Sequence, residues 1–293
     1  MNLFKTVALL GLLSGLLVGL CYWVIGGITG VLIGVVIAEA INLVSWFYSD
    51  KIALNTYRAQ PLSFQANPGL HSMVQHLCDR AGLPMPQLYI VPTAAPNAFA
   101  TGRDPQHAAV AVTEGILQLL PEDELEGVIA HELSHIQNRD TLTQAVSATV
   151  AGAITSLAQI AQFYTVFGGS RRQQRNSNPL VMLLTVMIAP VAATVIQMAI
   201  SRTREFAADA GAAKLTGNPR GLARALQRLD SGARKMPLQA NPAFEPLLIM
   251  NGFSGQMMAI LFSTHPSTEA RIQALLRLEQ DLTNLSSDSL LKP

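Results

Sequence analysis

The N-terminal fifty residues carry two long apolar stretches separated by a glycine-rich interruption. No charged residue occurs from Thr6 to Ala38. A helix crosses a bilayer core with roughly 20 apolar residues, so this stretch is too long for one span and fits two. The sequence GGITG at residues 26–30 is typical of a tight turn. We therefore predict helices near residues 4–25 and 30–48, which form a transmembrane hairpin over residues 1–50.

The charges that flank this hairpin predict its orientation. Lys5 precedes the first helix, Lys51 and Arg58 follow the second, and the turn contains no Lys or Arg. The positive-inside rule then places the N-terminus and the following domain in the cytoplasm. A cleaved signal peptide is disfavoured, because its apolar core usually has about 7–15 residues and no small-residue cleavage site ends this stretch. Glu39, near the middle of the second helix, is either functional or faces a neighbouring helix, and we favour the second interpretation.

A second hydrophobic hairpin is predicted over residues 141–201, where the stretches 141–170 and 176–201 carry no charge. Three arginines lie between the stretches: Arg171, Arg172 and Arg175. Two crossings would place these arginines outside the cell, against the positive-inside rule, whereas a hairpin that does not cross would leave them at the headgroups. We expect two crossings, because exposing a long apolar stretch to water is costly. The first stretch is rich in Ser, Thr and Gln, which predicts that it packs against protein.

Between and after the two hairpins, shorter patterns indicate a folded domain with halves at residues 51–140 and 202–293. A helix is expected at 69–81, and a small sheet is expected from strands at 87–92 and 108–112 together with residues 93–103. Another helix begins at Pro121, because acidic residues follow the proline and apolar residues then recur at helical spacing. Leucines after Pro219 indicate more helices, and linkers are expected at 60–68 and 232–246. The predicted fold class is α+β and mostly helical.

Composition narrows the classes of protein that this chain can be. It has 293 residues, of which 49% are hydrophobic and only 13% are charged. A disordered chain is excluded, because such chains are poor in apolar residues. Two cysteines in this length exclude a disulfide-stapled scaffold. The net charge of +1 provides no field that would attract nucleic acid, so no nucleic-acid partner is expected.

The candidate chemistry lies on the helix after Pro121, in the sequence HELSH at residues 131–135. His131 and His135 are four residues apart, so both imidazoles can face one cation. Glu132 is turned about 100° from His131 and can reach a water on the metal rather than the metal itself. Zinc suits these ligands, and catalytic zinc sites keep three protein ligands and one open position. One zinc ion per chain is predicted.

A third ligand is expected in the segment SRTREFAAD at residues 201–209. Glu205 and Asp209 share one face of a helix there. Glu205 can bind the metal while Asp209 accepts the second N–H of a ligand histidine. The alternative is that Glu205 pairs with Arg202 on a solvent-exposed face.

These motifs together resemble the HtpX-type membrane zinc metalloproteases, relatives of the CAAX prenyl proteases. Two further segments match, PNAFATG at 96–102 and THPS at 264–267 followed by Arg271. The resemblance implies a zincin-like domain in which His131, His135 and Glu205 bind zinc and Glu132 is the general base. It also implies that Asp209 orients a ligand, that Asn97 binds substrate backbone, and that His265, supported by Arg271, stabilises the oxyanion. A purely structural role is the alternative for His265.

Two functions compete at this stage. The first is an endopeptidase that cuts membrane or misfolded proteins at the cytoplasmic face of the cell membrane, with a role in quality control or stress response implied by the resemblance. The second is a membrane receptor or scaffold with a structural metal. Structural zinc sites usually have four ligands and use cysteine, so a cysteine-free site favours catalysis. A prenyl-protein processing protease is a narrower alternative. The pattern of residues predicts no oligomeric state.

Overall fold

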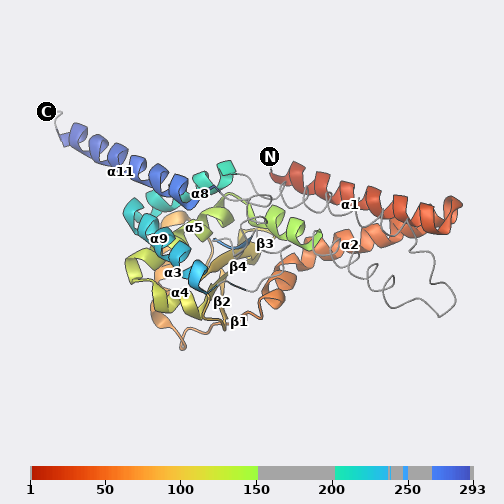
Figure 1. Cartoon of the computed structure of the whole chain (residues 1–293), viewed down its shortest axis with the longest axis horizontal. Helices are drawn as coiled ribbons and strands as arrows, with labels where there is room; N and C mark the ends of the chain where they lie inside the picture. The colour runs from red at the N-terminus through yellow and green to blue at the C-terminus, as the bar shows by residue number, and fades with distance from the viewer. Residues whose placement is uncertain (1, 151–201, 237, 239–246, 250–265, 291–293) are drawn as a thin grey trace.

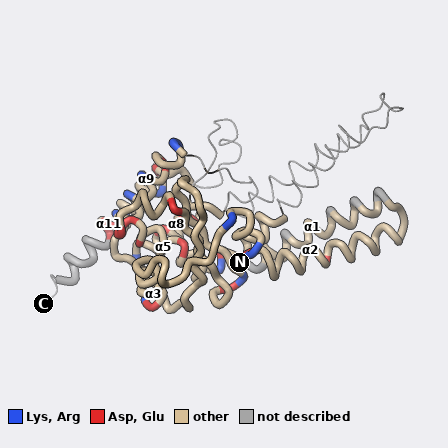
Figure 2. Tube along the Cα trace, turned by 90° about the horizontal axis from the view of Figure 1, so that it is seen from below, with Lys and Arg blue, Asp and Glu red and all other residues tan. Residues whose placement is uncertain are grey.

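The computed structural model describes residues 2–150, 202–236, 238, 247–249 and 266–290. It shows a globular part and a long helical arm (Figure 1). The arm consists of α1 (Asn2–Ile25) and α2 (Gly27–Thr56), which lie side by side and reach away from the globular part. Figure 2 shows charged residues gathered on the globular part, whereas the arm is almost free of them.

The two predicted helices of the arm are confirmed, with a shorter turn and a longer second helix than expected. Gly26 alone separates them, in a left-handed conformation with φ of 81°, and residues 29 and 30 are already helical. Gly34 allows the helices to touch, because a Cβ there would lie 2.7 Å from Val18 Cα. α2 continues past residue 48 because its last turns pack on the globular part, where Ala53 and Leu54 are buried.

The composition of α2 suits a lipid environment. It is the one helix within the described ranges that is both long and apolar enough to cross a membrane. Leu32 and Val36 leave 60% and 69% of their surface exposed, as expected for side chains that face lipid rather than water. The described apolar stretch of α1, Thr6–Gly19, is shorter. A double crossing by this arm therefore stays a prediction.

A four-stranded mixed sheet lies inside the globular part, in the order β1-β2-β4-β3. The strands are β1 (Gln60–Pro61), β2 (Gln87–Val91), β3 (Ala98–Gly102) and β4 (Ala108–Thr113). β2 and β4 are parallel, and β3 runs antiparallel to β4 with Phe99 opposite Ala111. The predicted strands are confirmed, but the expected linker at 60–68 was wrong at its start, because β1 lies there and pairs with β2.

Helices cover this sheet and enclose its core (Figure 1). In chain order they are α3 (Pro68–Ala81), η1 (Pro105–His107), α4 (Glu114–Leu119), α5 (Glu122–Gln137), α8 (Arg202–Thr216), α9 (Pro219–Lys235) and α11 (Thr268–Leu290). The helix predicted at 69–81 is confirmed as α3. The linker predicted from residue 232 was wrong at its start, because α9 continues to Lys235. The central element is α5, in which ten consecutive residues from Gly127 to Ile136 are buried.

Residues 141–150, which begin the second predicted hairpin, are helical, and all of them except Leu142 and Thr149 are buried. Their polar side chains contact protein, as predicted. Thr143 Oγ1 lies 3.0 Å from Thr6 Oγ1 of α1, and Ser147 Oγ donates to the Thr143 carbonyl. The contact between Thr143 and Thr6 joins the base of the arm to the globular part. The remaining predicted hairpin, residues 151–201, lies outside the described residues.

Candidate active site

The HELSH helix places two imidazoles in contact. α5 begins after Pro121, and Glu122, Asp123 and Glu124 occupy its first turn, where carboxylates favour the positive helix end. One turn separates His131 from His135, and their Nε2 atoms lie 3.2 Å apart. Both side chains are almost fully buried, with 1% and 4% of their surface exposed. Two imidazole nitrogens therefore converge on one point.

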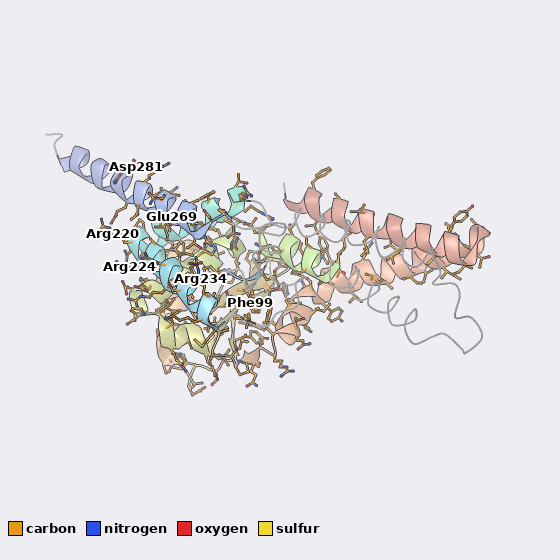
Figure 3. All side chains as sticks on the ribbon, in the orientation of Figure 1. Phe99, Arg220, Arg224, Arg234, Glu269 and Asp281 are labelled. Carbon is orange, nitrogen blue, oxygen red and sulfur yellow. The ribbon has the colours of Figure 1, made fainter. Side chains whose placement is uncertain are left out.

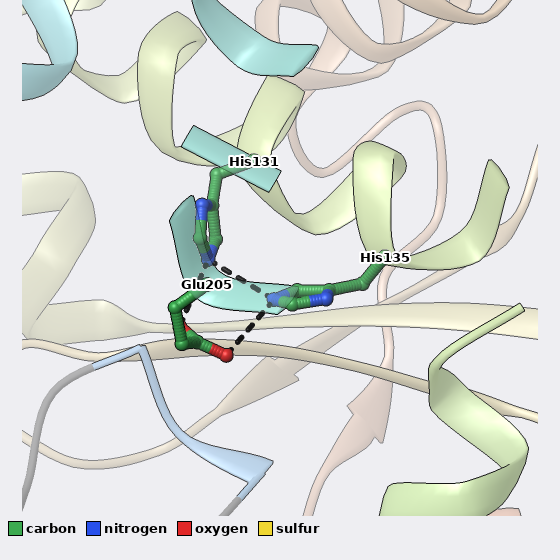
Figure 4. A group of neighbouring side chains, drawn as sticks. All are labelled: His131, His135 and Glu205. Atoms are coloured by element: carbon green, nitrogen blue, oxygen red, sulfur yellow. Dashed lines mark hydrogen bonds and ion pairs between the residues drawn. The ribbon is translucent and has the colours of Figure 1, made fainter. Parts of the chain in front are cut away.

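α8 brings a carboxylate to the same point (Figure 4). Glu205 Oε2 lies 3.7 Å from His131 Nε2, and Oε1 lies 3.5 Å from His135 Nε2. The two helices approach closely because Gly211 has no side chain, since a Cβ there would lie 2.6 Å from Ser134 Oγ. The alternative of a solvent-exposed Glu205–Arg202 pair is excluded, because Glu205 is buried while Arg202 is exposed.

The outer nitrogen of His131 contacts a carboxylate held by an arginine. Asp209 Oδ1 lies 2.9 Å from His131 Nδ1. Arg271 of α11 donates to both Asp209 oxygens, from Nη2 at 2.7 Å and from Nε at 2.9 Å. Burial alone would raise the pKa of Asp209, but the Arg271 charge and hydrogen bonds lower it to about 2. Asp209 is therefore an ionised acceptor, which makes His131 Nδ1 the donor and leaves Nε2 with its lone pair.

The outer nitrogen of His135 contacts a second carboxylate, which the sequence interpretation missed. Asp140 Oδ2 lies 3.2 Å from His135 Nδ1. Burial acts to lower the pKa of His135, and the carboxylates of Glu205, Asp140 and Glu132 outweigh burial and raise it. The signal in the sequence is an acidic residue shortly after the end of α5. Because it lies outside the helix, the 3.6-residue repeat does not predict the direction of its side chain.

Glu132 lies beside the histidines and is 2% exposed. Its carboxylate accepts the backbone N–H of Ala100 in β3. Burial raises the pKa of Glu132 to about 7, and the nearby His135 only partly offsets this. A carboxyl group with a pKa in this range can exchange a proton near neutral pH, which general acid–base chemistry requires.

The remaining site residues predicted from the sequence are Asn97, His265 and Arg271. Asn97 is buried at the start of β3, where its Oδ1 accepts the N–H of Ala98 at 3.0 Å. His265 lies outside the described residues. Arg271 contacts Asp209 in the described part of the chain, and its expected support of His265 stays a prediction. Three other histidines lie apart from the centre: His71 at the Leu62 carbonyl, His107 at Asp104, and an exposed His76.

The centre combines two buried histidines one turn apart, a glutamate between them and a carboxylate from a second helix. This combination defines the class of metalloproteases that carry the HExxH motif. The chain belongs to peptidase family M48, whose family model matches residues 65–279. It is 66% identical over 287 residues to "Protease HtpX homolog" of Trichormus variabilis, covering 97% of this chain and 99% of that protein. It is 67% identical over 282 residues to the protein of the same name from Nostoc punctiforme, covering 96% and 98%.

A solved structure shows the same fold. The match is with Ste24p from S. mikatae, at a TM-score of 0.50 and 20% identity, and it covers 82% of this chain. This chain spans a little over half of the Ste24p chain, 57% of its length. The family model and the two relatives confirm the resemblance to HtpX-type proteases. The chain is a metalloprotease that acts on polypeptides.

Proposed function

We propose that this protein is a zinc-dependent endopeptidase at the cytoplasmic face of the cell membrane, cutting membrane or misfolded proteins in quality control or stress response. The observation that carries the proposal is the convergence of His131, His135 and Glu205 beside a buried Glu132. All ligand atoms of the first three residues lie within 4.8 Å of one another. HtpX-type relatives that match nearly the full length of this chain support the same class of reaction.

Zinc fits this donor set by its chemistry and by the spacing of the atoms. Two ligands in a tetrahedron with bonds of roughly 2.0–2.1 Å lie about 3.3 Å apart. In the structure the two Nε2 atoms lie 3.2 Å apart, and each lies near one Glu205 oxygen: His135 at 3.5 Å from Oε1 and His131 at 3.7 Å from Oε2. His131, His135 and Glu205 would hold the ion, which leaves one position for water or substrate. When bound there, zinc lowers the pKa of water and polarises a carbonyl.

The residues of the chain would then share the proton chemistry. Glu132 takes a proton from the attacking water and returns it to the leaving amine, because its raised pKa allows both steps near neutral pH. Asp209 keeps His131 Nε2 directed at the ion. Asn97 and His265 are proposed to contact the substrate backbone and the oxyanion, as the family resemblance implies.

The edge strand β3 is the proposed place for an extended substrate, which would add a strand by backbone hydrogen bonds. Two backbone carbonyls on the outer edge of β3 already accept hydrogen bonds from other parts of this chain. The Ala98 carbonyl accepts the N–H of Ile249 at 3.1 Å, and the Gly102 carbonyl accepts the Thr141 hydroxyl at 2.8 Å. A peptide can pair at these positions only after the groups that now fill them have moved.

The decisive experiment uses Glu132→Gln in the full chain, purified in detergent with chelator and then supplied with zinc. We expect normal zinc content and a loss of peptidase activity of about 10²–10⁴-fold, the usual contribution of a general base. Glu126→Gln is the matched control, on the same helix but half-buried. Wild-type turnover in Glu132→Gln would contradict the role of Glu132. Zinc bound by a wild-type chain that cleaves no polypeptide would favour a structural metal.

The membrane topology has its own test. In a chain that lacks Cys21 and Cys78, a cysteine is introduced at Gln173, which lies outside the described residues. Two crossings predict that an impermeant thiol reagent labels it from outside the cell. A cysteine at Gln75, exposed on α3, is the control and should be labelled only after permeabilisation. Labelling at Gln173 only after permeabilisation would exclude the two-crossing topology.

A further inference from the structure

His135 is supported by two side chains that have no role in the site as described so far. We propose that Asp140 and Arg204 are positioning residues for His135: Asp140 accepts its Nδ1–H and thereby directs Nε2 to the metal, while Arg204 holds the Asp140 carboxylate in place. Asp140 Oδ2 lies 3.2 Å from His135 Nδ1, and Arg204 Nη1 lies 3.9 Å from Asp140 Oδ1. This inference rests on the proposed zinc centre.

The place of Asp140 is set by the way the HELSH helix ends. Arg139 adopts a left-handed backbone with φ of 56°, which reverses the chain after α5. The Asp140 N–H then donates to the His135 carbonyl at 2.9 Å, and the Asp140 carbonyl accepts the N–H of Gln144 at 3.1 Å. The backbone therefore ties Asp140 to the residue that its side chain contacts. Only 1% of Asp140 is exposed, so its acceptor atoms are aimed at protein groups.

The contact defines which nitrogen of His135 can bind a metal. An ionised carboxylate only accepts hydrogen bonds, so Nδ1 must be the donor, and Nε2 then carries the lone pair. Nε2 is the atom that faces His131 and Glu205. Without this acceptor, the ring could take the other tautomer or rotate, and metal affinity would fall.

Arg204 provides charge rather than a hydrogen bond. The side chain is 8% exposed, and none of its three guanidinium nitrogens makes a hydrogen bond within the described structure. A buried cation in that state is costly, and the nearby carboxylates of Asp140 and Glu205 offset only part of this cost. Arg204 directly precedes Glu205 on α8, so the Asp140–Arg204 pair links the two helices that supply the metal ligands.

The experiment measures metal affinity directly, in the full-length chain in detergent after removal of metal. Zinc affinity is obtained by competition with a chromophoric chelator, and the visible absorption of bound Co²⁺ reports ligand geometry. Asp140→Asn should weaken zinc binding by about 10–100-fold, the usual effect of mutating the partner of a ligand histidine, because it replaces a charged, acceptor-only carboxylate with a neutral amide. Arg204→Gln should cause a smaller loss and no further loss in the Asp140→Asn background, because Arg204 acts through Asp140. Arg204→Lys keeps the charge and should retain wild-type affinity.

The matched control is Asp230→Asn, which removes the carboxylate that pairs with the exposed Arg234 of α9. Figure 3 labels Arg234 on this helix. It should leave zinc affinity and the Co²⁺ spectrum unchanged. A purely structural Asp140 would shift the melting temperature of the metal-free protein and leave zinc affinity at the wild-type value, and that result would overturn the proposal. Equal effects of Arg204→Gln in the wild-type and Asp140→Asn backgrounds would overturn the role of Arg204.

Two outcomes separate this proposal from the function on which it rests. A wild-type chain that binds no zinc refutes the zinc centre itself. A wild-type chain that binds zinc as tightly as Asp140→Asn refutes only the role of Asp140. If Asp140→Asn does not fold, the arginine variants decide, because the proposal requires affinity to fall in Arg204→Gln and to be kept in Arg204→Lys.

Discussion

His131 and His135 are each contacted by a carboxylate that has an arginine beside it. These two supporting arms, distinct from the helical arm of α1 and α2, have similar chemistry and different construction. In the first arm, Asp209 lies 2.9 Å from His131, and Arg271 holds both Asp209 oxygens at 2.7 and 2.9 Å. In the second arm, Asp140 lies 3.2 Å from His135 and Arg204 lies 3.9 Å from Asp140. The first arm is a tight, doubly bonded network, and the second is a looser one whose arginine contributes only charge.

The difference follows from where each arm draws its residues. The first arm joins α5, α8 and α11, so it forms only when three helices have packed together. The acid of the second arm is five residues from its histidine and is placed by the end of α5 itself. We infer that the first arm couples the metal centre to the stability of the whole globular part, whereas the second mainly tunes one ligand.

The largest expected effect comes from Glu205, the carboxylate that faces both histidines. Glu205 faces His131 and His135 at once, so Glu205→Ala should abolish zinc binding whatever the state of either arm. Atomic emission on the purified protein measures the zinc content. Glu126→Ala on α5 is the control and should keep a full complement. A full complement in Glu205→Ala would mean that another residue is the third ligand.

The next largest effect concerns stability, and it should separate the two arms. Breaking a buried ion pair from one side costs about 3–5 kcal/mol, because the remaining charge is left uncompensated. Arg271 is 2% exposed and bonded to both Asp209 oxygens, so Arg271→Gln should destabilise the metal-free protein by about this amount. Arg204→Gln should cost clearly less, because no hydrogen bond is lost.

Unfolding of the metal-free protein in detergent measures both variants. Arg234→Gln, on the exposed face of α9, is the control and should stay near the wild-type stability. Equal losses from Arg271→Gln and Arg204→Gln would contradict the distinction between a tight and a loose arm.

The same contrast shows how far the sequence alone reaches. The spacing of His131 and His135, with Glu132 between them, is a local property of a helix, so it was predictable from the repeat alone. Glu205 and Asp209 were predictable because they share a face one turn apart. Asp140 was missed because its position depends on a left-handed residue at Arg139, which no periodicity marks.

Contacts between residues far apart in the chain could not be predicted from local patterns. The expectation that Arg271 supports His265 came from a family resemblance and stays a prediction, because His265 lies outside the described residues. The contact of Arg271 with Asp209, 62 residues away in the chain, was not predicted. The two helices α1 and α2 were predictable from the uncharged length of the N-terminal stretch. The extension of α2 to Thr56 was not, because it depends on packing against the sheet rather than on hydropathy.

Acid should weaken the first arm in a defined pH range. The pKa of Asp209 is about 2 in the folded chain against 3.8 for the ordinary side chain. A carboxyl group with a lowered folded pKa stabilises the protein above its unfolded pKa, and this contribution disappears as the pH falls through the folded pKa. The contribution is on the order of 2 kcal/mol.

Comparison with Asp209→Asn isolates this contribution from those of other carboxyl groups. The stability difference between the metal-free wild type and the variant should shrink as the pH is lowered from about 5 to about 2. A difference that stays constant over this range would show that the Arg271 contact does not hold Asp209 ionised.

The smallest expected effect is also the sharpest comparison, because one substitution is made in both arms. Lysine keeps the charge of arginine but cannot donate two parallel hydrogen bonds to a carboxylate. Arg271→Lys should therefore weaken zinc binding by about tenfold, near the lower limit for loss of a supporting hydrogen-bond partner. Arg204→Lys should leave zinc affinity unchanged, because Arg204 makes no hydrogen bond to lose. Chelator competition measures both variants. If Arg204→Lys weakens binding as much as Arg271→Lys does, the second arm relies on guanidinium geometry and is built like the first.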